Sequence, residues 1–127
     1  TVVASSNPEG RALQQARTED GITISEVLVN AIARRNASGN AAGVCGAVIG
    51  ATRDDVGRAL MERLGSALIL VPGLGAQGAD YGALAKFPCP RTVIPTAARA
   101  VLSTAGDEAT FRGTLARQCN DSMRLRD

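Results

Sequence analysis

The 127-residue sequence predicts an α/β fold in which four short strands alternate with helices. Three observations lead to this prediction. Runs of β-branched and other apolar residues recur four times, amphipathic helical patterns lie between the runs, and glycine, proline or hydroxyl residues follow each run. Strands that alternate with helices form parallel sheets with right-handed crossovers. The pattern fits an open doubly wound sheet or part of a closed (β/α)₈ barrel, which needs about 250 residues when complete.

The four expected strands span residues 1–4, 44–49, 67–71 and 92–94. Each is apolar on both faces, which is typical of a strand buried within a parallel sheet. The first expected strand begins at the first residue, which is not methionine. We therefore expect residues 1–127 to form one domain that is a fragment of a longer protein.

The expected helices span residues 24–34, 54–64, 80–86, 98–103 and 108–124. The first has an apolar stripe that consists of Ile24, Val27, Leu28, Ala31 and Ile32. The second has a stripe of Val56, Leu60 and Leu64. Asp54 or Asp55 stands where the second helix needs an N-cap, and Gly65 follows its end. We expect the two aspartates to be caps and not a catalytic pair.

Composition argues against several classes of protein. The net charge of +2 comes from 14 basic and 12 acidic residues that are scattered along the chain, so a nucleic-acid surface is not expected. No apolar run approaches the roughly 20 residues of a membrane span, and the first residues do not form a signal peptide. The three cysteines are odd in number and unclustered, which argues against a zinc site or a disulfide framework. We expect a cytoplasmic protein whose Cys45, Cys89 and Cys119 are buried thiols.

Small and polar residues follow each expected strand, at residues 5–10, 50–52, 72–78 and 95–99. In both architectures ligands bind beyond the carboxyl ends of the strands. Glycines allow backbone N–H groups to approach an anion, and an arginine adds two charge-assisted hydrogen bonds. Arg99 is the arginine expected at a strand end beside the glycine loop, whereas Arg53, Arg91 and Arg112 are expected outside the site. The pattern predicts a polar, anionic ligand.

The third of these loops contains a G-x-G-x-x-G pattern, formed by Gly73, Gly75 and Gly78. This pattern also occurs in dinucleotide-binding folds, where a long helix follows it. Here Pro88 ends the helical region ten residues after Gly78, and no acid that could bind a ribose follows the next strand. Since Arg99 could accept a 2′-phosphate, an NADP-binding domain stays open as a minor alternative.

Four segments together resemble the long bacterial form of the orotidine 5′-monophosphate decarboxylases. The letters L-V-P-G-L-G-A-Q-G at residues 70–78 are similar to that family's phosphate loop, P-G-x-G-A-Q-G-G. S-S-N-P-E-G at residues 5–10 resembles S-N-P-x-G, and I-G-A-T at residues 49–52 resembles V-G-A-T. A-R-A-V-L at residues 98–102 resembles S-R-A-I-L. The resemblance spans essentially the whole chain and implies the C-terminal half of a (β/α)₈ barrel, with strands five to eight.

The resemblance implies roles for five residues. Ser6 would hydrogen-bond the pyrimidine, and Gln77 would bridge the base and the phosphate. The backbone of Gly78 and Ala79 would cradle the phosphate, and Arg99 would pair with it. The chain departs from the family where Ala79 replaces the second glycine of a pair. It departs again at residue 98, where an alanine replaces a serine.

The family converts orotidine monophosphate to uridine monophosphate and CO₂ without a metal or cofactor. Its catalytic D-x-K-x-x-D array belongs to strands two and three, and no such pattern occurs in this chain. We expect Lys86, the single lysine, to be a surface residue. The resemblance therefore implies an inactive fragment whose partners are a pyrimidine nucleotide, a missing N-terminal half barrel and, in the full-length form, a second identical subunit. A non-catalytic or degenerate phosphate-binding half barrel is the other alternative.

Overall fold

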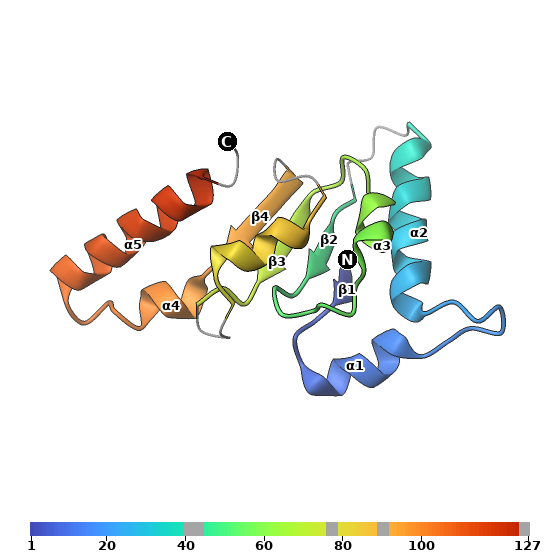
Figure 1. Ribbon diagram of the computed structural model, residues 1–127, viewed down its shortest axis with the longest axis horizontal. Helices are drawn as coiled ribbons and strands as arrows, with labels where there is room; N and C mark the ends of the chain where they lie inside the picture. Colours follow the sequence, from blue (N-terminus) through green and yellow to red (C-terminus); the bar gives the residue numbers. More distant parts are fainter. Residues whose placement is uncertain (40–44, 76–78, 89–91, 125–127) are drawn as a thin grey trace.

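The computed structural model describes residues 1–39, 45–75, 79–88 and 92–124. Its centre is a parallel sheet of β1 (Val2–Ala4), β2 (Ala47–Ile49), β3 (Ile69–Pro72) and β4 (Val93–Thr96), in the order β1-β2-β3-β4 (Figure 1). A doubly wound sheet reverses its strand order at a switch point, whereas a barrel adds each strand beside the previous one. The described sheet has no reversal. The prediction of an α/β fold with four parallel strands is confirmed, and the order matches about half of a barrel.

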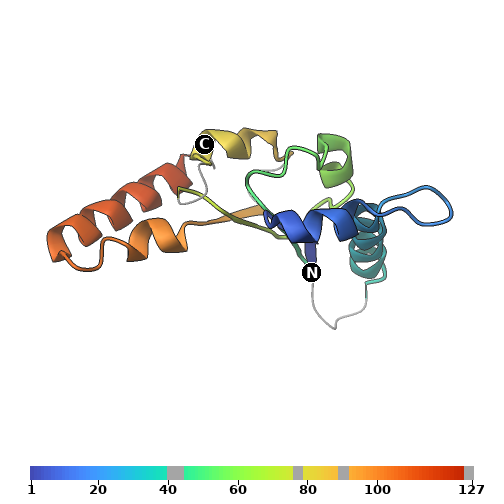
Figure 2. The same ribbon diagram turned by 90° about the horizontal axis from the view of Figure 1, so that it is seen from below.

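Six helices connect or follow the strands in the described residues. They are α1 (Pro8–Gln15), α2 (Ile24–Ala37), α3 (Arg58–Glu62), the 3₁₀ helix η1 (Tyr81–Lys86), α4 (Ala98–Leu102) and α5 (Glu108–Met123). Figure 2 shows α2, α3 and η1 along one side of the sheet. α1 and α4 lie at the end of the sheet toward which the strand arrows point (Figure 1). No described helix is both long and apolar enough to cross a membrane.

The two faces of the sheet have different surroundings. The face toward the helices is fully buried and includes Val3, Ile49 and Val71. On the other face, Val2 pairs with Val48, Val48 with Leu70, and Leu70 with Ile94, so these four residues form one lateral row. The exposed fractions of Val2, Leu70 and Ile94 are 53%, 37% and 42%. The sequence is thus apolar on both faces, but the described chain covers only one of them.

α2 is the best-defined helix at the sequence level. The Thr23 side chain accepts from the Glu26 backbone N–H at 3.2 Å, and the Glu26 carboxylate accepts from the Thr23 N–H at 2.7 Å, which together form a capping box. These hydrogen bonds hold the pKa of Glu26 below its ordinary value. The buried face differs from the expected stripe because it consists of Ser25, Val29 and Ile32. The Ser25 hydroxyl donates to the Val3 carbonyl at 2.8 Å, which fixes α2 to β1 and brings this face inward.

The expected start of the second helix is wrong. α3 begins at Arg58, with Gly57 as its N-cap, so neither Asp54 nor Asp55 caps it. Both carboxylates bind cations instead, Asp54 that of Lys86 and Asp55 that of Arg53. Gly65 lies past the helix end with φ +56°, in the left-handed region that favours glycine, as expected.

α1 begins within residues 5–10, where the sequence patterns predicted only a loop. Its start nevertheless has a clear signature, because Asn7 is the N-cap, Pro8 follows at the first helical position, and Glu9 lies in the first turn. The helix is mostly solvent-exposed, and its one buried residue is Gln14. A polar residue at the only buried position explains why no apolar periodicity indicated this helix.

Candidate functional site

The carboxyl ends of the first three strands are hydrogen-bonded to one another. The Gly50 N–H donates to the Ala4 carbonyl at 2.8 Å, and the Ala51 N–H donates to the Pro72 carbonyl at 2.9 Å. The turn after β2 therefore lies between the residues after β1 and those after β3. This arrangement brings three of the four sequence-predicted loops to one edge of the sheet.

Ser6, the expected pyrimidine-binding residue, is half-buried at this edge. Its hydroxyl lies 3.4 Å from that of Thr52, and a Cβ built on Gly50 would lie 2.3 Å from the Ser6 oxygen. Glycine at position 50 is thus needed for space beside Ser6. A cavity of about 230 Å³ opens here, lined by Ser5, Ser6, Asn7, Pro8, Arg11, Thr52 and Arg53.

Arg53 forms one wall of this cavity, which corrects the expectation that it lies outside the site. Its side chain is only 5% exposed. The guanidinium donates to the Ser5 carbonyl at 2.6 Å, to the Gln14 side-chain oxygen, and twice to the Asp55 carboxylate at 2.6 Å. These hydrogen bonds, foremost those from Arg53, hold the pKa of Asp55 well below its ordinary value. Sequence reasoning missed this network because its members come from three separate segments.

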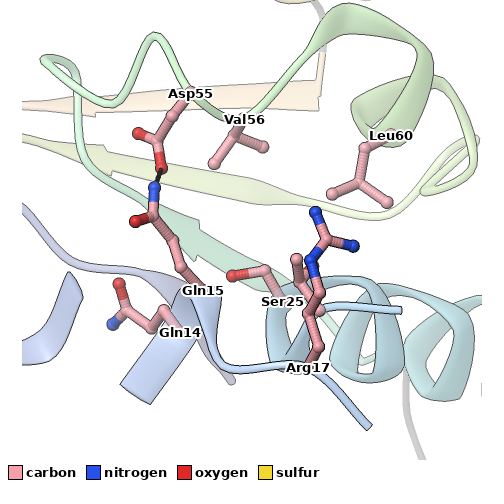
Figure 3. Close-up of a pocket in the computed structure, with 8 residues that line it drawn as sticks. Gln14, Gln15, Arg17, Ser25, Asp55, Val56 and Leu60 are labelled. Atoms are coloured by element: carbon pink, nitrogen blue, oxygen red, sulfur yellow. Dashed lines mark hydrogen bonds between the residues drawn. The ribbon is translucent and has the colours of Figure 1, made fainter. Parts of the chain in front are cut away.

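A larger cavity, of about 430 Å³, lies between α1, the start of α2 and residues 55–60 (Figure 3). Gln15 donates to the Asp55 carboxylate at 2.9 Å across one side of it (Figure 3). The cavity is lined by Gln14, Gln15, Arg17, Thr23, Ser25, Asp55, Val56 and Leu60, and none of these comes directly after a strand. We regard the smaller cavity as the better candidate for a ligand site because it lies at the strand ends.

The glycine loop after β3 has the backbone conformation that its glycines allow. Gly73 has φ +107° and Gly75 has φ +72°. The Gly75 N–H donates to the Ala79 carbonyl at 2.7 Å, so the loop closes on itself. Gln77 and Gly78, the expected base–phosphate bridge and phosphate cradle, lie outside the described residues. Ala79 is buried and does not have a positive φ, so the alanine that replaces glycine here introduces no backbone strain.

Arg99, the expected phosphate-binding residue, is exposed on α4. A Cβ built on Gly75 would lie 2.7 Å from the Cβ of Ala100, the residue next to Arg99. The glycine loop therefore packs directly against α4. Within the described residues, no ion pair involves Arg99. Its guanidinium is thus available to an anion beside the loop.

No described contact joins Ser6 to Arg99, which come after the two edge strands β1 and β4. Three strand spacings of about 4.8 Å separate those strands by roughly 14 Å. The expected pyrimidine-binding and phosphate-binding residues therefore lie at opposite ends of the described edge, as the two ends of an extended ligand would require.

Lys86 is not the surface residue that the sequence suggested. Its ammonium donates to the Ala51 carbonyl at 2.7 Å and to the Asp54 carboxylate at 2.9 Å, and its side chain is 21% exposed. The η1 helix folds back toward the turn after β2, which a prediction from helix position alone could not include. Lys86 therefore links the glycine-loop side of the site to the Ser6 side.

The dinucleotide alternative loses its structural basis. A pyrophosphate site of that kind needs an α-helix whose free N–H groups face the glycine loop. Here the loop is followed by the six-residue helix η1, and the Asp80 carboxylate accepts from the Ala83 N–H at 3.0 Å. A carboxylate at this helix start would repel a second anion.

Neither a metal centre nor a pair of reactive thiols occurs in the described residues. No described group of His, Cys, Asp and Glu side chains could hold a metal ion. Cys45 is half-buried and Cys119 is exposed, so the expectation of buried thiols is wrong for Cys119. Cys89 lies outside the described residues.

Comparison with known proteins gives a consistent family. No family model matches the chain. An orotidine 5′-phosphate decarboxylase of Myxococcus xanthus is 48% identical over 120 residues, which are 91% of this chain and 42% of the relative. A second, from Salinispora tropica, is 39% identical over 91% of this chain and 42% of its own length. The chain thus spans less than half the length of these curated relatives.

Solved structures agree with the sequence comparison. A crystal structure from Streptomyces avermitilis that is assigned as an orotidine 5′-phosphate decarboxylase matches 98% of this chain and 44% of its own, with a TM-score of 0.79 and 30% identity. The structure of the Leishmania donovani enzyme matches with a TM-score of 0.72 at 20% identity, which supports the fold alone. The resemblance stated from the sequence motifs is confirmed, and the fold corresponds to about half of the neighbours' (β/α)₈ barrel.

Proposed function

We propose that this chain, a homologue of part of the orotidine 5′-phosphate decarboxylases, is the C-terminal half barrel of such an enzyme. In this proposal the chain binds the nucleotide, and a missing N-terminal half supplies the lysine and carboxylates that decarboxylate it. The observation that carries the proposal is the contact between the glycine loop and α4, which places a free arginine beside backbone N–H groups that can approach an anion.

The residues directly after each strand support the assignment to the C-terminal half. A hydroxyl residue comes after β1, a glycine loop after β3, and an arginine after β4, in the order that the family resemblance requires. Remote phosphate binding can supply energy that organises a reacting centre elsewhere in an enzyme. We infer that Ser6 binds the pyrimidine, that Gln77, Gly78 and Ala79 form the phosphate loop, and that Arg99 pairs with the phosphate.

The missing half barrel is the proposed cover for the open face of the sheet. Val2, Leu70 and Ile94 are exposed there, and β1 and β4 are both edge strands in the described sheet. A groove of about 760 Å³ lies along β4, between α4 and α5. Exposed apolar faces and unpaired edges of this kind mark surfaces that require a partner. The family resemblance also predicts a homodimer in the cytoplasm.

A chimera tests this function. The chain would replace the 120 matching residues of the Myxococcus xanthus relative, and decarboxylation of orotidine monophosphate and binding of uridine monophosphate would be measured. We expect a folded chimera that binds the nucleotide and turns over substrate, whereas the isolated chain should not turn over. A folded chimera that binds no uridine monophosphate would contradict the proposal. Binding without turnover would favour the degenerate phosphate-binding half barrel instead.

A further inference from the structure

We propose that Arg53 is a positioning residue that fixes the backbone at Ser5 and thereby orients Ser6 for recognition of a pyrimidine ring. The inference rests on the proposed function, which assigns the pyrimidine contact to Ser6. Arg53 touches no reacting atom in this proposal. Its effect on the ligand passes through the peptide unit between Ser5 and Ser6.

Arg53 holds that peptide unit directly. Its guanidinium donates to the Ser5 carbonyl at 2.6 Å, over 48 residues of sequence. A peptide bond is planar, so the Ser5 carbonyl and the Ser6 N–H belong to one rigid group. Fixing the carbonyl therefore fixes the direction in which the chain enters Ser6.

A second contact removes the remaining freedom of Ser5. Gln14 accepts from the Ser5 N–H at 3.2 Å and donates to the Ser5 hydroxyl at 3.1 Å. The same Gln14 oxygen accepts from Arg53, so the arginine also holds the glutamine in place. The N–H, hydroxyl and carbonyl of Ser5 are thus all engaged, whereas the Ser6 hydroxyl faces the cavity that both residues line.

The Asp55 carboxylate makes a buried arginine possible here. Its two oxygens accept from the Arg53 Nε and Nη2, each at 2.6 Å, which is the bidentate geometry that suits a planar guanidinium. A buried charge without a partner would be strongly unfavourable. Lysine could not reach Asp55 and the Ser5 carbonyl at once with the same geometry, because it lacks the planar fork.

The space beside Ser6 depends on the same turn. Ser6 is confined by Gly50, where an added Cβ would lie 2.3 Å from the Ser6 oxygen and 3.4 Å from the Arg53 Cγ. Arg53 and Gly50 therefore act from one short segment, the first by holding the backbone and the second by leaving room for the hydroxyl.

The experiment uses the chimera with this entire chain and compares two ligands, uridine monophosphate and ribose 5-phosphate. Only the first has a pyrimidine. For Arg53→Gln we expect a loss of about two- to tenfold in affinity for uridine monophosphate, the scale of one hydrogen bond. Affinity for ribose 5-phosphate should change less than about twofold. Arg53→Lys should fall between wild type and Arg53→Gln, because it keeps the charge and one donor.

A double mutant separates positioning from general destabilisation. If Arg53 acts through Ser6, the Ser6→Ala/Arg53→Gln double mutant should bind uridine monophosphate no worse than Ser6→Ala alone. Arg58→Gln is the matched control, since Arg58 is exposed and pairs only with Glu62 among described residues. Asp55→Asn tests the same inference if Arg53→Gln does not fold, and it should show the same ligand selectivity.

The outcomes are distinguishable. Equal losses for both ligands, or additive effects of Ser6→Ala and Arg53→Gln, would overturn the positioning role while leaving the proposed function intact. If Ser6→Ala itself left uridine monophosphate binding unchanged, the assignment of Ser6 under the proposed function would fail, and this inference with it.

Discussion

Replacement of Gly75 by alanine should damage both the stability of the barrel and its grip on phosphate. The left-handed conformation, φ +72°, costs about 1–2 kcal/mol for a residue with a Cβ. The new Cβ would also lie 2.7 Å from that of Ala100, short of the 3.4 Å at which ordinary contact begins. Overpacking of this kind costs about 1–3 kcal/mol. Alanine restricts the unfolded chain and returns about 0.4–1 kcal/mol, so the net loss should be about 2–4 kcal/mol.

The assay is urea unfolding of the chimera, together with binding of uridine monophosphate and of uridine. We expect Gly75→Ala to weaken binding of the nucleotide more than of the nucleoside, because α4 must move and Arg99 is the neighbour of Ala100. Adding Ala100→Gly should remove the crowding but leave the cost of the positive φ, with a helix penalty of about 0.5–1 kcal/mol. The double mutant should therefore recover only part of the loss.

Gly113 provides the matched control. It lies within α5, has no positive φ, and a Cβ built on it meets no described atom within 4 Å. Gly113→Ala should stabilise the protein by about 0.5–1 kcal/mol. If Gly75→Ala had the same small effect as Gly113→Ala, or if Ala100→Gly restored nothing, the contact between the glycine loop and α4 would not be as the structure has it.

Three further predictions concern the charge network and the missing half. Arg99→Ala in the chimera should cost about 1.5–3 kcal/mol of uridine monophosphate binding but leave uridine binding nearly unchanged, since only the nucleotide has a phosphate; a comparable loss on Arg112→Ala, whose exposed side chain pairs with Glu108, would refute the placement of the site. The isolated chain should show no decarboxylation above background and should self-associate, so measurable turnover or a dilute monomer in sedimentation would count against it. The depressed pKa of Asp55 stabilises the folded state above the ordinary value of 3.8, and this contribution is lost as the pH falls below it. Urea unfolding at pH 5 and pH 3 should therefore show a larger loss for wild type than for Asp55→Asn, and equal losses would contradict the contribution.

The strand order and the ligand-binding edge could be predicted from sequence because both depend on local patterns. Four apolar runs separated by helical patterns fix a parallel sheet, and the glycine loop and Arg99 stand directly after strands. The helix ends were less accessible, since Asp54 and Asp55 satisfy the rules for an N-cap equally well whether or not cations compete for them. In the structure, Lys86 and Arg53 take both carboxylates, and α3 begins later.

Arg53 shows most clearly what a single sequence cannot reveal. Its hydrogen-bond partners Ser5 and Gln14 lie 48 and 39 residues away, so no local motif joins them. The buried position of Gln14 on an otherwise exposed helix also has no apolar signal. Long-range polar networks of this kind depend on the completed fold, whereas strand and loop patterns do not.

The lateral row of Val2, Val48, Leu70 and Ile94 gives one substitution two opposite meanings. In the isolated chain Leu70 is partly exposed, so Leu70→Lys should raise solubility at little cost in folding. In a closed barrel the same side chain belongs to the packed interior, where an unpaired ammonium would oppose assembly. Selection for soluble expression of this piece alone would therefore favour sequences that can no longer join the other half, and a library meant to yield an active enzyme has to be screened in the assembled form.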